Sequence, residues 1–101
     1  MTYILQVDFQ HDGPFGDNMV AAFTELAESI NEEQGFIWKI WTENEETKEA
    51  GGIYLFETEE DAERYLAMHT DRLTGFGVPA VNAKIFKTNA VLSKLNRGPI
   101  R

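Results

Sequence analysis

The stretch that decides the fold is GFIWKIWTENEETKEAGGIYLF, residues 35–56. Two apolar runs flank the acidic segment NEETKEAG, which is typical of a β-hairpin. Successive side chains of a strand point to opposite faces, so Trp38 and Trp41, three positions apart, must lie on different faces of the sheet. A tryptophan is not expected on a sheet face that is exposed to solvent. The hairpin therefore predicts that both faces of this sheet are covered.

The segments around the hairpin complete a regular order of strands and helices. Alternating apolar side chains predict strands, and apolar side chains at helical spacing predict helices. The predicted strands are 2–10, 36–43, 52–58 and 81–89, and the predicted helices are 19–33 and 59–73. This β-α-β-β-α-β order is typical of the α+β, ferredoxin-like fold, in which both helices cover one face of a four-stranded antiparallel sheet. We expect one domain over residues 1–101, with 89–101 as a C-terminal tail.

Short polar signals predict where the helices begin. Asp17 or Asn18 is expected to cap the first helix, because both side chains accept hydrogen bonds from free backbone N–H groups. Thr58, followed by Asp61 three residues later, resembles a capping box for the second helix. Gly51–Gly52 indicates a bulge or the start of a strand.

Composition excludes several classes of function. The net charge is −8 and only nine Lys and Arg residues are present, which argues against a nucleic-acid partner. The chain has no cysteine, so disulfides, thiolate zinc sites and a cysteine nucleophile are excluded. No apolar run reaches the ~18 residues of a membrane span, and the N-terminus does not resemble a signal peptide. We expect a cytoplasmic protein with no membrane partner.

The sheet face away from the helices is expected to bind a second copy of the chain. It carries one of the two tryptophans and two large side chains of the third strand, together about 500 Å² of apolar surface. Patches of that size usually mark an interaction, and a two-fold dimer covers them most simply. Because Gln6 and Asp8 are polar, the interior between two facing sheets is expected to hold a small molecule. The alternative is a dry dimer core in which the second tryptophan is only structural.

Three blocks of the sequence resemble a known family. They are WKIWTENEETKEAGGIYLFETEEDAERYLAMH at 38–69, VNAKIF at 81–86 and LNRGPI at 95–100. Together with the order of elements, they resemble the YdhR-type monooxygenases over essentially the whole chain. The resemblance implies a homodimeric α/β barrel of a superfamily that includes cofactor-independent monooxygenases acting on quinols and polyketide aromatics. The superfamily also includes haem-degrading enzymes, isomerases and members without known activity.

Cofactor-independent oxygenation suggests which residues to expect at the site. The substrate must lose a proton to become a phenolate or carbanion, inside a dry pocket with a base and aromatic walls. His69 is the candidate base because an unperturbed histidine titrates near neutral pH, and Tyr54 is the candidate hydrogen-bond donor. The candidate substrate-binding residues are Trp38, Trp41, Phe56, Gln6 and Asp8.

Each assignment has a structural alternative. His69 lies on the apolar stripe of the second predicted helix, where a half-buried structural histidine is common, and core packing also explains Tyr54 and Phe56. No metal or cofactor is expected, because the two histidines lack ligand spacing. Haem chemistry is disfavoured because the haem-degrading relatives use an asparagine on the first strand, where this chain has Gln6 and Asp8. The sequence favours an oxygenase of a small aromatic compound, with a non-catalytic binding or sensing dimer as the alternative.

Overall fold

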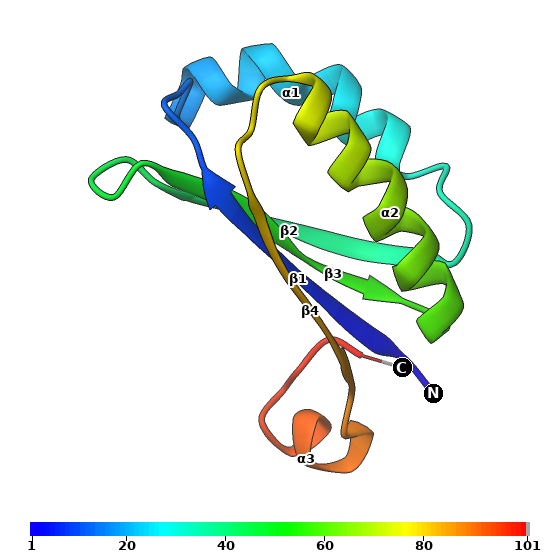
Figure 1. Ribbon diagram of the computed structural model, residues 1–101. Helices are drawn as coiled ribbons and strands as arrows, with labels where there is room; N and C mark the ends of the chain where they lie inside the picture. Colours follow the sequence, from blue (N-terminus) through cyan, green and yellow to red (C-terminus); the bar gives the residue numbers. More distant parts are fainter. Residues whose placement is uncertain (101) are drawn as a thin grey trace.

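The computed structural model describes residues 1–100 and has two layers, a four-stranded antiparallel sheet and two long helices that cover one of its faces (Figure 1). The elements are β1 (Tyr3–Gln10), α1 (Gly16–Ile30), β2 (Phe36–Asn44), β3 (Glu49–Phe56), α2 (Glu59–Gly75), β4 (Val81–Lys87) and α3 (Ala90–Leu95). Their order confirms the predicted ferredoxin-like α+β fold. Residue 101, the last of the predicted tail, lies outside the described residues.

The strands lie in the order β2-β3-β1-β4, so that β3 and β1 are central. In the β1–β3 pair, Leu5 lies opposite Tyr54 and Val7 lies opposite Gly52. Since alternate residues of a strand share one face, this register gathers the apolar side chains of both central strands beneath the helices. The predicted alternation of residues 2–10 therefore sets the core face of the sheet.

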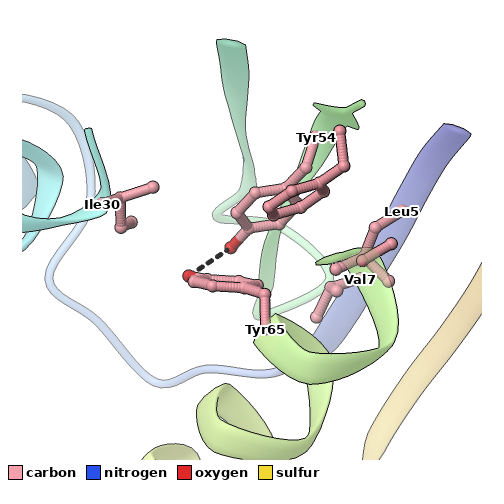
Figure 2. Close-up of a cluster of buried hydrophobic side chains, with 7 residues drawn as sticks. Leu5, Val7, Ile30, Tyr54 and Tyr65 are labelled. Carbon is pink, nitrogen blue, oxygen red and sulfur yellow. Dashed lines mark hydrogen bonds between the residues drawn. The ribbon is translucent and has the colours of Figure 1, made fainter. Parts of the chain in front are cut away.

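The core lies between the central strands and the helices (Figure 2). Its buried members are Leu5, Val7, Ile30, Tyr54, Phe56, Ala62 and Tyr65. Figure 2 shows the rings of Tyr54 and Tyr65 facing each other between β3 and α2, with their hydroxyl groups joined by a hydrogen bond of 3.3 Å. Burying a large side chain contributes roughly 1.5–3 kcal/mol, so this cluster is the main attachment of α2 to the sheet.

The two helix starts differ in how they are capped. Thr58 accepts a hydrogen bond from the backbone N–H of Asp61 at 3.0 Å, which confirms the predicted cap of α2. The prediction for α1 was wrong, because the helix begins at Gly16, before Asp17 and Asn18, and its N-cap residue makes no side-chain hydrogen bond. Instead, the backbone N–H of Gly16 donates to the Glu43 carboxylate of β2 at 2.8 Å. A carboxylate also complements the positive end of a helix, and its origin in another element hides it from local sequence patterns.

Gly51 and Gly52 lie inside β3, and the irregular register of the sheet falls between Phe36 and Trp38 instead. The prediction of a bulge or a strand start at the two glycines was therefore wrong, because β3 begins at Glu49. A Cβ atom on Gly51 would collide with the backbone carbonyl oxygen of Val7. A Cβ atom on Gly52 would lie 2.5 Å from Cε of Lys39. The glycines let neighbouring strands and one long side chain approach closely.

The two tryptophans lie on opposite faces of the sheet, as predicted. Trp41 pairs with Gly52 on the helix-covered face, where it packs against the core, whereas Trp38 pairs with Leu55 on the other face. The indole N–H of Trp38 donates to the carbonyl oxygen of Pro99 at 2.8 Å. The C-terminal segment of the chain therefore contacts the open face of its own sheet, beyond α3, which lies away from the helix layer (Figure 1).

Candidate active site

A cavity of about 310 Å³ lies between the helices and the sheet within one chain. From α1, Met19, Phe23 and Leu26 line it, and their spacing of four and three residues places them on one side of the helix. From the sheet, Trp41 and Tyr54 line it. The cavity is thus a gap in the core layer, walled mainly by apolar side chains.

The aromatic walls of the cavity come from different elements. The rings of Phe23 and Trp41 are stacked, with centroids 6.2 Å apart and planes 20° apart. Phe9 of β1 and His11 of the following loop also line the cavity. His11 Nε2 donates to the carbonyl oxygen of Pro14 at 2.9 Å, which fixes this loop beside the cavity. Flat walls of this kind suit a planar ligand.

Lys39 brings an amine into this apolar surrounding. Its Nζ atom lies 3.3 Å from the centroid of the Trp41 ring and 4.6 Å from that of the Tyr54 ring. Burial, and to a smaller extent the nearby charge of Arg72, together lower the pKa of Lys39 from its usual 10.5 to about 7. Among the described residues, no aspartate or glutamate lines the cavity. Lys39 therefore holds its proton only weakly at neutral pH.

His69 is buried on the inner side of α2, with 4% of its surface exposed. Its ring stacks on Tyr65, with centroids 5.2 Å apart, and within the described residues Nδ1 has no hydrogen-bond partner. Burial, with smaller contributions from the charges of Arg72 and Lys39, lowers the pKa of His69 to about 4. The sequence suggested a base that titrates near neutrality. The structure instead holds a neutral imidazole that is a weak base, because it is desolvated beside two cations.

Tyr54 forms part of the cavity wall and part of the core, with 1% of its surface exposed. Burial raises the pKa of its hydroxyl group, and Tyr65 adds to the rise, so the group stays protonated. The hydroxyl of Tyr54 accepts the hydrogen bond from Tyr65. Its own proton is therefore free for a second acceptor, such as an oxygen atom of a ligand.

The structure brings together three of the residues singled out from the sequence. Trp41, Tyr54 and His69 all line the cavity. They come from three different elements, β2, β3 and α2. The candidate hydrogen-bond donor, the candidate base and one candidate wall thus share one space.

The other four candidates lie elsewhere. Phe56 is completely buried in the core and does not line the cavity. Trp38 lies on the opposite face of the sheet, together with Gln6 and Asp8, whose carboxylate accepts a hydrogen bond from Asn82 at 3.0 Å. We expected a cavity between two facing sheets, but this one lies on the helix side of a single sheet. Strand alternation shows which residues share a face, and it leaves open which face holds the cavity.

Sequence reasoning did not select Lys39 as a candidate site residue, although it lines the cavity. A usable signal was present, because Lys39 and Trp41 are two positions apart on one strand and must share a face. Within residues 1–100, no three histidine, aspartate or glutamate side chains gather in a group that could hold a metal ion. In the same range, no helix is long and apolar enough to cross a membrane.

Comparisons with known proteins agree with this architecture. A family model described as "Putative mono-oxygenase ydhR" matches residues 4–99. Among solved structures, a mutant of SnoaB, a cofactor-independent oxygenase from Streptomyces nogalater, superposes with a TM-score of 0.61 at 14% identity. The match covers 87% of this chain and 93% of that chain, and the low identity limits it to a likeness of fold. No curated protein matches the sequence.

Proposed function

The chain belongs to the ydhR family of mono-oxygenases, and from this premise we propose that it is a cofactor-independent monooxygenase of a small aromatic compound, a quinol or polyphenol. The observation that carries the proposal is the aromatic-walled cavity, in which Trp41, Tyr54 and His69 meet. At about 310 Å³, it is at the lower end of the range for small-molecule sites, which favours a ligand of one or two rings. The similarity in fold to SnoaB, a cofactor-independent oxygenase, also supports this proposal.

A quinol can supply all the electrons that such a reaction needs. A hydroquinone and one molecule of O₂ give a hydroxyquinone and one molecule of water, so one oxygen atom enters the ring and the other leaves as water. The protein then has to orient the ring, exclude water and favour loss of the hydroxyl proton. The stacked rings of Phe23 and Trp41 form an orienting wall. Tyr54 donates a hydrogen bond to a substrate oxygen, and neutral His69 accepts one through Nδ1.

We also propose that the protein works as a homodimer in the cytoplasm, with the open sheet faces in contact. On that face Ile40 has 55% and Phe86 has 49% of its surface exposed, and Ile53 lies beside Ile40 in the register. Covering such side chains gains roughly 25 cal/mol for each Å² removed from water. A dimer through this face leaves the cavity, on the helix side, open to substrate in each protomer.

The proposal is tested by oxygen uptake with chelator-treated, flavin-free protein and a panel of quinols and polyhydroxylated aromatics, with autoxidation subtracted. We expect saturable uptake with one class of compound. Trp41→Leu removes a cavity wall and should reduce kcat/KM at least ~10-fold, which corresponds to a loss of about 1.4 kcal/mol of transition-state stabilisation. Trp38→Leu, the matched change on the opposite face, should leave it nearly unchanged. Saturable binding without uptake across the panel would refute the oxygenase and indicate a binding or sensing module.

A further inference from the structure

The cavity contains basic groups without an acidic partner. Lys39 crosses the space above Gly52, where any larger residue would collide with its Cε atom. Its Nζ atom lies over the rings of Trp41 and Tyr54 and forms no ion pair or hydrogen bond within the described residues. A buried amine without a partner is costly. An amine held in this way is ready for a ligand that provides the missing partner.

The groups around Lys39 all favour an anion. Tyr54 faces it from β3, and the polar side chains of α2 whose charges couple to it are His69 and Arg72. The Arg72 guanidinium is cationic, and its Nε atom has no hydrogen-bond partner within the described residues. The side chains that α1 contributes to the cavity are Met19, Phe23 and Leu26, which carry no charge. A negatively charged ligand in the cavity would therefore lie beside Lys39, with the Arg72 charge nearby, and no carboxylate among the described lining residues would repel it.

We propose that the cavity takes a substrate with an acidic phenolic or enolic hydroxyl group, and that Lys39 accepts the hydroxyl proton and remains beside the product anion as its counter-ion. The O–H bond breaks with its electron pair left on oxygen, and the lone pair of the Lys39 amine forms the new N–H bond. The step needs no oxidant. It extends the proposed function by naming the catalytic residue that generates the reactive anion.

Of the two basic side chains in the cavity, Lys39 and His69, Lys39 is better suited to accept the hydroxyl proton. A general base works best when its pKa is near the working pH, and burial lowers the pKa of Lys39 to about 7. The pKa of His69 is lowered to about 4, too low for efficient proton abstraction from a phenol. After the transfer, the ammonium group lies over the Trp41 ring, where a cation–π contact stabilises it. The phenolate and the ammonium then neutralise each other in a dry space.

The proposal is tested with 4-nitrophenol, a phenol whose ionised form is coloured and whose binding needs no turnover. At a pH below the probe's own pKa, the bound probe should be ionised in the wild-type protein. The ratio of ionised to neutral probe should exceed that of the free probe by about tenfold or more. Lys39→Met, which keeps the length of the side chain, should abolish this excess. Lys84→Met, a matched change on the open sheet face, should preserve it.

A second variant separates proton acceptance from charge. Lys39→Arg keeps the positive charge but has no lone pair to accept a proton, so the bound probe should remain ionised while oxygen uptake loses its rise with pH around 7. A bound probe that stays neutral in the wild type, or ionises equally in Lys39→Met, overturns the proposal, as does failure of the probe to bind. Ionisation by Lys39 without oxygen uptake on any quinol supports the proton transfer and refutes only the oxygenase.

Discussion

The hydroxyl group of Tyr65 on α2 donates a hydrogen bond to the hydroxyl group of Tyr54 on β3, across 3.3 Å (Figure 2). Both side chains belong to the buried core, and Tyr54 also lines the cavity. The bond therefore ties the helix layer to the sheet at the edge of the candidate site. The bond also orients the hydroxyl of Tyr54. Because the Tyr54 oxygen acts as the acceptor, its own proton is left to donate to another group.

Tyr65→Phe should lower the free energy of unfolding by about 1 kcal/mol, because it removes one buried hydrogen bond and leaves the Tyr54 oxygen without its donor. Tyr3→Phe is the matched control, since Tyr3 is only half-buried and lies outside the core cluster. Urea unfolding of the two variants measures the difference. Equal stabilities for the two variants would show that the hydroxyl pair contributes nothing.

Gly51→Ala should destabilise the fold by about 3 kcal/mol, which is typical of severe overpacking. The added Cβ atom would collide with the backbone carbonyl oxygen of Val7 and force the two central strands apart. Gly75→Ala is the control, because no atom lies within 4 Å of the corresponding Cβ position at the end of α2. It should leave stability unchanged or raise it by less than about 1 kcal/mol. Thermal melts compare the two, and a neutral Gly51→Ala would contradict the close strand approach.

Much of this fold could be predicted from the sequence, because its decisive signals are local. Alternation in residues 2–10 and helical spacing in residues 59–73 report directly on which side chains face the core. The Thr58 cap is local too, since its partner is three residues away. The start of α1 could not be read in this way, because Glu43 caps it from another strand. The role of the two glycines of β3 could not be predicted locally either, because it depends on close contacts with residues of the neighbouring strands.

The candidate site was predicted in part. Aromatic and polar residue types identified Trp41, Tyr54 and His69, which the fold brings together. The expected cavity between two facing sheets stays a prediction, and the cavity of the single chain lies on the helix side, because alternation alone does not say which face holds a cavity. Lys39 was overlooked because lysines on strands usually reach water. The pKa of His69 depends on burial and on cations from other elements, so no local pattern could predict it.

Lys39→Met should raise the stability of the unliganded protein at neutral pH by about 2 kcal/mol, because it removes a buried amine without an acidic partner. The folded pKa of Lys39, about 7, is below its usual 10.5. Between these values the unfolded chain binds more protons than the folded one, so wild-type stability rises with pH across this window and falls toward pH 7. The advantage of the variant should therefore shrink between pH 7 and pH 10. Chemical unfolding across this range measures it, and an advantage that does not vary with pH would contradict the lowered pKa.

Phe86→Asp and Ile40→Asp should each weaken the proposed dimer, since both place a charge on the exposed open face. The wild type is expected to sediment as a dimer at micromolar concentration and each variant as a monomer. Val20→Asp is the matched control, because Val20 is similarly exposed but lies on α1. A wild type that stays monomeric in sedimentation velocity would refute the dimer.

The two tryptophans give separate reports on the two faces of the sheet. Trp41 lines the cavity, whereas Trp38 lies on the opposite face, bonded to Pro99. Binding of 4-nitrophenol in the cavity should therefore quench the fluorescence of Trp41 strongly and in a saturable manner. Trp38→Phe, which keeps Trp41, should retain the saturable signal, and Trp41→Phe, which keeps Trp38, should lose at least half of it. Saturable quenching of equal size in both variants would place the ligand outside the cavity, because only a site between the helices and the sheet brings it against Trp41 alone.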